Sequence, residues 1–162
     1  MNRRFAFRGH AWVALAVRLY LGGVFLFACA HKVLHPEVFA VDVATYQLLP
    51  LELVNLFALV LPWVEALAGI MLVLGIRVRA ASLLVAGMMV AFMVALSWAL
   101  YLGLDMSCGC FASQGAAEDD PISWRTWLRD LVWLLQSIYV LVFDRNAIGV
   151  ERLWRIWRKR HG

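Results

Sequence analysis

Two cysteines separated by one glycine, Cys108 and Cys110, are the residues best suited to chemistry in this sequence. A disulfide between them would close a very short and strained ring, and a strained disulfide is more easily reduced. Gly109 supplies the backbone freedom that such a ring needs. So short a loop removes little chain entropy, so the bond would add little stability. The spacing therefore favours a working dithiol/disulfide pair over a structural staple.

Metal binding is the main alternative for this pair. Two thiolates with Met106 nearby are soft sulfur ligands of the kind that Cu(I) prefers. A zinc site needs about four ligands, and the remaining candidates, Cys29, His31 and His35, follow no zinc-ligand pattern. We therefore assign no metal ligands, and keep Cu(I) binding and a pair without chemistry as the alternatives.

Several side chains could support the cysteine pair. A cation near a thiol lowers the thiol pKa and favours the reactive thiolate, which makes Lys32 and Arg129 candidates for tuning. The alternative for each cation is snorkelling towards lipid headgroups. Asp130 can pair with either of them. Cys29 is a candidate third thiol for exchange, or a small buried residue at a helix interface.

Two further charges, Arg18 and Glu65, interrupt strongly apolar segments. Charges at membrane depth are costly and usually face a partner or a cavity. At about 1.5 Å per helical residue, they lie about 10 Å and about 14 Å from the same end of their helices. We therefore expect an Arg18–Glu65 pair. It would be either an ion pair that sets helix register or the wall of a buried polar pocket, for a quinone or for proton movement.

The composition requires a membrane around these residues. Of the 162 residues, 64% are hydrophobic and 16% are charged, whereas soluble domains average about 45–50% apolar and about 25% charged residues. Four apolar runs are long enough to cross about 30 Å of hydrocarbon. The first run could alternatively belong to a signal peptide, but it is longer than the apolar core of one. Since only helices suit such spans in lipid, we predict an all-α, integral membrane four-helix bundle. The runs are 11–30, 53–74, 80–103 and 124–143.

Basic residues predict the orientation of the bundle. They cluster before the first run, between the second and third, and after the fourth, and such clusters mark the cytoplasmic side. Both termini are then cytoplasmic, and the cysteine loop lies on the outer face of a bacterial inner membrane. Disulfides persist in the compartment outside that membrane. We expect a transmembrane domain over 1–145 and a basic amphipathic tail over 146–162, either on anionic lipid or acting as a stop-transfer signal. No nucleic-acid partner is expected.

Several segments, in this order and spacing, resemble the MauE/DoxX family of redox-associated membrane proteins, and most of all its MauE-like branch. The similarity covers nearly all of residues 14–143. One departure is Ala112, where the family usually has glycine. The matching segments are Arg18 with the run 21–40, then "YQLLP" at 46–50, "LPWVEALAGIMLVLG" at 61–75, "CGCF" at 108–111 and "ISWRTWLRDL" at 122–131.

This resemblance implies a four-helix membrane bundle linked to methylamine utilisation. It also implies a role in forming or transporting disulfides in the cysteine-rich small subunit of methylamine dehydrogenase, beside a thioredoxin-like partner. The positions that match the family are Arg18, Lys32, Pro36, Tyr46, Pro50, Glu65, Cys108, Cys110, Arg129 and Asp130.

The residues and the resemblance together predict a membrane thiol-disulfide oxidoreductase. Cys108 and Cys110 would exchange disulfides with an extracytoplasmic thioredoxin-like protein or a secreted client, and electrons would pass on to quinone. The alternative is a non-enzymatic assembly or maturation subunit whose cysteine pair is structural or binds Cu(I). Four helices without an evident internal repeat weigh against small-molecule transport.

Overall fold

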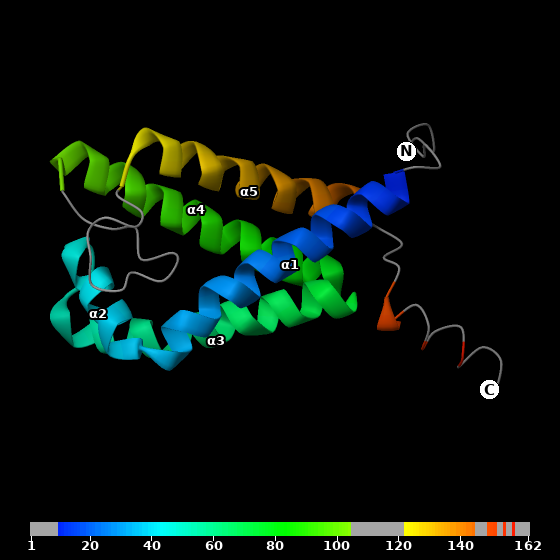
Figure 1. Ribbon diagram of the computed structural model, residues 1–162, viewed down its shortest axis with the longest axis horizontal. Helices are drawn as coiled ribbons and strands as arrows, with labels where there is room; N and C mark the ends of the chain where they lie inside the picture. Colours follow the sequence, from blue (N-terminus) through cyan, green and yellow to red (C-terminus); the bar gives the residue numbers. More distant parts are fainter. Residues whose placement is uncertain (1–9, 105–121, 145–148, 152–153, 155–156, 158–162) are drawn as a thin grey trace.

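The computed structural model describes residues 10–104, 122–144 and 149–151, together with Trp154 and Trp157. Within these ranges the chain forms five helices and no strand (Figure 1). The helices are α1 (His10–Leu34), α2 (Pro36–Thr45), α3 (Leu51–Leu74), α4 (Val78–Leu102) and α5 (Trp124–Phe143).

Four of the helices are long and apolar enough to cross a membrane, which confirms the predicted all-α membrane bundle. Their candidate spans are Ala11–Leu34, Leu51–Leu74, Val78–Leu102 and Trp124–Phe143. The last span coincides with the predicted run 124–143, and the first extends four residues beyond the predicted end of the run 11–30. The direction in which the bundle sits in the membrane stays a prediction.

Helix α2 was not predicted, because the chain between the first two spans was treated as a loop. Pro36 occupies the start of the helix and Glu37 its first turn, which suit the unpaired N–H groups and the helix dipole there. Phe39 and Val43, four residues apart, are buried against α3 in one apolar cluster. The proline and this spacing were the available sequence signal.

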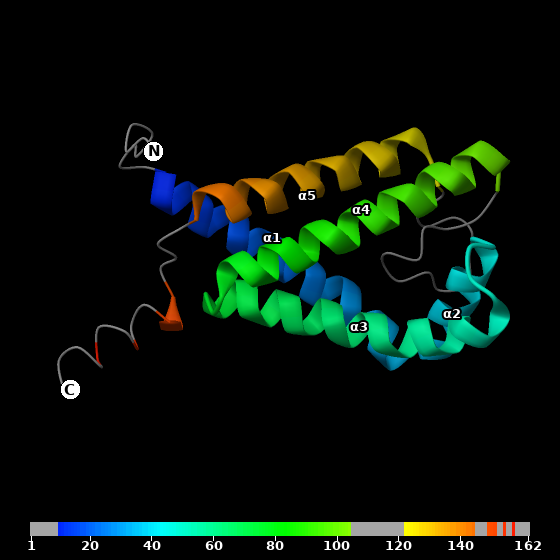
Figure 2. The ribbon, with the colours of Figure 1, turned by 180° about the vertical axis from the view of Figure 1, so that it is seen from behind.

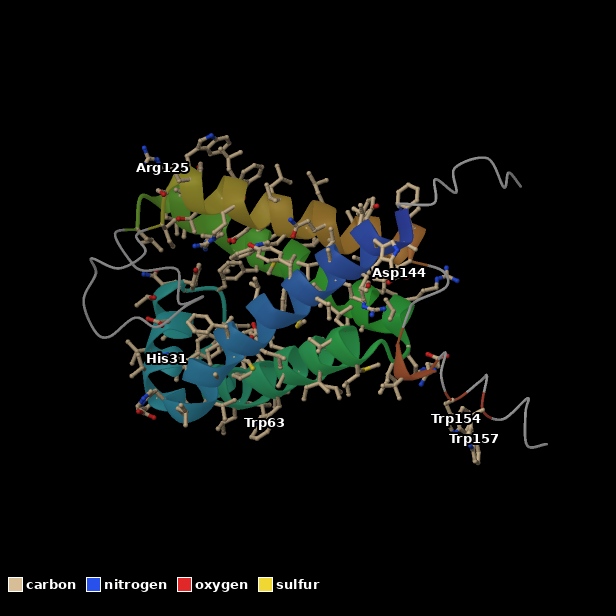
Figure 3. All side chains as sticks on the ribbon, turned by 45° about the vertical axis from the view of Figure 1, so that its right-hand side comes forward. His31, Trp63, Arg125, Asp144, Trp154 and Trp157 are labelled. Carbon is tan, nitrogen blue, oxygen red and sulfur yellow. The ribbon has the colours of Figure 1, made fainter. Side chains whose placement is uncertain are left out.

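The bundle has two ends that differ in character. At one, the α2 end, α1 and α4 finish and α3 and α5 begin; at the other, the turn end, α3 is joined to α4. Figures 1 and 2 both show α1 and α3 diverging from α4 and α5 towards the α2 end. His31 and Arg125 lie at this end and Asp144 at the other (Figure 3). The two helix pairs are therefore farther apart at the α2 end than at the turn end.

Glycines bring α1 and α3 into close contact. A Cβ added to Gly22 would lie 2.7 Å from Cγ2 of Val73 and 3.0 Å from the Gly69 carbonyl oxygen. Gly22 and Gly69 therefore allow the backbones of α1 and α3 to approach closely. Gly23 and Gly87 differ, since an added Cβ would meet nothing within 4 Å at either position.

The tail returns to the turn end of the bundle. Gly75 ends α3 in the left-handed conformation, with φ of 70°, and an added Cβ there would lie 2.8 Å from Cα of Gly149. The Arg77 backbone N–H donates to Oε2 of Glu151 at 2.9 Å. Trp154 and Trp157, both exposed, follow at this end (Figure 3).

Candidate functional site

A buried ion pair links α1 to α3. Lys32 Nζ donates to Oε1 and Oε2 of Glu65 at 2.8 and 3.0 Å, and the two side chains are only 8% and 10% exposed. The ammonium also lies 4.9 Å from the ring centroid of Phe39 on α2. Three elements therefore converge on one cation, which is buried in the bundle instead of reaching towards lipid headgroups.

The predicted pairing of Arg18 with Glu65 is wrong, and the direction in which helical side chains lean explains why. Side chains lean towards the N-terminus of their own helix. Lys32 on α1 therefore leans back into the bundle, and Glu65 on the antiparallel α3 leans up to meet it. The same rule directs Arg18 away from Glu65, towards the turn end.

Arg18 instead pairs with Asp144, which the sequence reasoning missed. Arg18 Nη1 donates to Oδ2 of Asp144 at 3.2 Å, and the side chains are 1% and 8% exposed. Asp144 directly follows α5, and burial raises its pKa more than the charge of Arg18 lowers it. An aspartate just after an apolar run was the only sequence signal. This pair ties the first span to the end of the last one.

Asp130 on α5 is fully buried beside Arg129. Arg129 Nε donates to Oδ1 of Asp130 at 3.1 Å, so the predicted pairing of Asp130 with Arg129 is confirmed, whereas that with Lys32 is not formed. The Arg129 guanidinium lies 4.8 Å from the ring centroid of Trp133. Trp133 Nε1 in turn donates to the Tyr20 hydroxyl at 3.3 Å. Arg129 thereby links the buried carboxylate of Asp130 to Trp133, and Trp133 links α5 to α1.

A cavity of about 890 Å³ occupies the space between the diverging helices, and we call it the central cavity. All five helices contribute to its lining, which is predominantly apolar. A buried polar pocket was predicted with Arg18 and Glu65; Glu65 lines this cavity and Arg18 does not. Within the described residues, its charged lining side chains are Lys32, Asp42, Glu65 and Asp130.

Of the three cysteines in the chain, the structure describes Cys29. It is buried, and its Sγ donates to the Leu26 carbonyl oxygen at 3.2 Å. It does not line the central cavity. This placement suits a small buried helix residue better than a third exchanging thiol, while its part in exchange stays a prediction.

Cys108 and Cys110 lie outside the described residues, but both ends of their segment are placed. The chain leaves α4 through Gly103 and Leu104 and returns through Ser123, whose hydroxyl caps α5 by accepting from the Thr126 backbone N–H at 3.4 Å. Both points belong to the α2 end. The cysteine segment therefore starts and finishes at the end of the bundle where the helices diverge.

The remaining metal candidates are not arranged as a site in the part of the chain that the structure describes. The rings of His31 and His35 lie 5.0 Å apart, and Cys29 is directed to a backbone carbonyl. Among the described residues, no three His, Cys, Asp or Glu side chains are grouped to hold a metal ion. Cu(I) binding by Cys108 and Cys110 stays an alternative hypothesis.

Comparison with known proteins places this bundle in a family. The model of the family described as methylamine utilisation protein MauE matches residues 10–143, which include all five helices. The chain belongs to the MauE family. The predicted resemblance to the MauE branch is thus confirmed. The predicted relation to DoxX proteins stays a prediction.

One curated relative extends this result. The methylamine utilization protein MauE of Paracoccus denitrificans is 33% identical over 121 residues, which are 74% of this chain and 63% of the relative. The chain therefore spans less than two thirds of that relative's length. No solved structure matches the chain.

Proposed function

We propose that this MauE family member is a thiol/disulfide redox protein of the bacterial inner membrane, with Cys108 and Cys110 on the outer face. One observation supports this most: both anchors of the cysteine segment lie at the α2 end, and the central cavity, which holds the buried Lys32–Glu65 pair, extends to this end at Leu48 and Leu49. Buried charges of this kind in a membrane protein are a mark of function. The basic clusters support the outward orientation.

The proposed reaction begins with the Cys108–Cys110 disulfide. A thiolate of a thioredoxin-like protein attacks one of the two sulfurs, the S–S bond breaks, and a mixed disulfide forms. The second thiolate of the partner then attacks the partner's sulfur in the mixed disulfide, which releases the cysteine of the membrane protein as a thiolate. The partner leaves oxidised, and two electrons and two protons stay on the Cys108–Cys110 pair. Disulfides thereby pass from the membrane protein to its partner.

Lys32 and Arg129 have different roles in this proposal. Lys32 lines the central cavity and is held by Glu65, so we propose that it contacts a ligand bound in the cavity. Arg129 is about a third exposed, at 30%, and a cation near a thiol favours the thiolate. Arg129, with Asp130 as its anchor, is therefore our candidate to tune the cysteine pair.

The client is proposed from the family. The Paracoccus denitrificans relative carries the name methylamine utilization protein, and we propose that the disulfides serve the maturation of a cysteine-rich enzyme such as methylamine dehydrogenase. The alternative is a non-enzymatic assembly subunit whose cysteine pair is structural or binds Cu(I).

Trapping of the mixed disulfide tests the exchange reaction. Single Cys108→Ser and Cys110→Ser variants are expressed with a candidate thioredoxin-like partner whose second cysteine is changed to serine, so that neither protein can resolve a mixed disulfide formed in the oxidising outer compartment. Covalent adducts are separated by non-reducing electrophoresis and identified by mass spectrometry. At least one variant should accumulate an adduct that reductant removes. Cys29→Ser is the matched control, since it removes the buried thiol and should leave disulfide transfer intact.

Two results would contradict the exchange reaction. The first is the absence of any adduct from both single variants while methylamine-dependent growth is preserved in the variant lacking both cysteines. The second is stoichiometric copper in the purified protein that is lost with the same two cysteines, which would support the Cu(I) alternative.

A further inference from the structure

The central cavity is open to the lipid-facing side of the bundle. Two of its lining residues, Phe57 on α3 and Leu83 on α4, are 41% and 61% exposed. Both lie within candidate membrane spans. Its volume of about 890 Å³ falls in the range of small-molecule sites, about 300–1,000 Å³. A ligand can therefore enter from the hydrocarbon, and it must be soluble there.

The charged lining favours a neutral ligand that accepts hydrogen bonds. An ammonium has three N–H donors, and the hydrogen bonds of Lys32 within the described chain go to the two carboxylate oxygens of Glu65. The third N–H donor makes no hydrogen bond within the described chain; it lies beside the Phe39 ring, 4.9 Å from its centroid, and can be donated to a ligand oxygen. Asp42, Glu65 and Asp130 also make the lining more acidic than basic, which disfavours an anionic lipid headgroup.

The remaining lining favours a flat ring. Aromatic side chains come from α1, α2, α3, α4 and α5, and aromatic groups prefer offset-stacked or edge-to-face contacts with one another. A planar, neutral, lipid-soluble molecule with carbonyl oxygens meets both requirements. The aromatic lining residues are Phe25, Phe39, Tyr46, Phe57, Phe92 and Trp133.

We propose that the central cavity binds a lipid quinone, with the Lys32 ammonium donating a hydrogen bond to one quinone carbonyl oxygen. Glu65 holds the ammonium in place, and the isoprenoid tail leaves between Phe57 and Leu83 towards the lipid. The proposal names the electron acceptor of the proposed thiol/disulfide exchange, on which its redox step rests. The contacts proposed for binding come from described residues.

The redox step balances with quinone as the oxidant. The Cys108 and Cys110 dithiol loses two electrons and two protons as the S–S bond forms. The quinone gains both, and its two carbonyl oxygens become the hydroxyls of a quinol. Negative charge develops on the quinone oxygen as electrons arrive, and a fixed ammonium in a site of low dielectric stabilises such charge strongly. Lys32 is thereby placed to assist reduction as well as binding.

Binding is tested with decylubiquinone on the purified full chain in nanodiscs, with both outer cysteines changed to serine so that no reduction occurs. Quenching of tryptophan fluorescence reports occupancy, since Trp133 lines the cavity. Gly87→Leu should weaken binding at least tenfold, because Gly87 lines the cavity and has open space around it. Gly23→Leu is the matched control, with equally open space outside the cavity, and should bind as the parent does.

A second variant tests the polar contact. Lys32→Met combined with Glu65→Leu removes both charges without leaving either one buried alone, and should weaken decylubiquinone binding about tenfold or more. That loss corresponds to about 1.4 kcal/mol. Dodecanol, which has a tail and no quinone ring, should compete poorly with decylubiquinone for the parent protein.

Other outcomes overturn the quinone proposal. The first is that neither Gly87→Leu nor the Lys32/Glu65 double variant changes decylubiquinone binding. The second is that dodecanol competes as well as a quinone does, which would mean that the cavity binds lipid tails. If quinone binding fails while the mixed disulfide is still trapped, the exchange reaction stands with another acceptor. If quinone binds and no adduct forms, the exchange reaction is the part that fails.

Discussion

The Lys32–Glu65 ion pair can be tested by a double-mutant cycle. The three variants are Lys32→Met, Glu65→Leu and the two together, which replace the charges with apolar groups of similar size. The pair is nearly buried and its closest N–O distance is 2.8 Å. At that distance and an effective dielectric constant of about 20, the Coulomb attraction is about 6 kcal/mol, and the loss of hydration on burial offsets much of it.

The sizes of the expected effects follow from which charge is left alone. Lys32→Met leaves the Glu65 carboxylate buried without its cation, and should cost about 3–5 kcal/mol of unfolding free energy. Glu65→Leu should cost less, because Asp42 and Asp130 line the same cavity as the remaining ammonium. The double variant should be nearly neutral. The interaction energy from the cycle should then exceed about 2 kcal/mol.

Unfolding of the purified protein in mixed micelles, by titration with a denaturing detergent and followed by circular dichroism, measures these free energies. Ser82→Ala is the control: its hydroxyl is buried and has no hydrogen-bond partner among the described residues, so its loss should cost little. If the two single costs simply add in the double variant, the two charges do not interact, and the assigned contact between α1 and α3 is refuted.

Three further predictions concern packing, pH and capping. Gly22→Leu should cost about 1–3 kcal/mol of unfolding free energy, because an added Cβ would lie 2.7 Å from Val73, whereas Gly23→Leu should be tolerated; equal thermal midpoints would contradict this. Burial raises the pKa of Asp144 above its ordinary value of 3.8, so the folded state holds this proton more tightly than the unfolded state does. The wild-type protein should therefore lose stability relative to the Asp144→Asn variant as pH rises from about 4 through the raised pKa; a wild-type thermal midpoint that stays constant or rises relative to that of the variant over this range would refute the assignment. Ser123→Ala should lower the unfolding free energy by about 1 kcal/mol through loss of the α5 cap, and no change in thermal midpoint would show that the cap contributes nothing.

The outline of the fold could be predicted from the sequence because lipid leaves few options. A spanning segment must satisfy its own backbone hydrogen bonds, so four long apolar runs imply four helices wherever their partners lie. The run 124–143 coincides with α5. The matching segments, in their order and spacing, also indicate the MauE family, which the match over residues 10–143 confirms. Both inferences need the sequence and no knowledge of how the helices pack.

The partners of the charged residues depend on how the helices cross, and no local pattern contains that. Counting residues along each helix placed Arg18 and Glu65 at similar depths, yet opposite lean directions send Arg18 to Asp144 and Lys32 to Glu65. The central cavity likewise depends on how the helices pack, because all five of them contribute side chains to its lining. The sequence by itself determined that buried charges would need partners; the tertiary structure decided which partners, because antiparallel helices bring side chains together by direction as well as by depth.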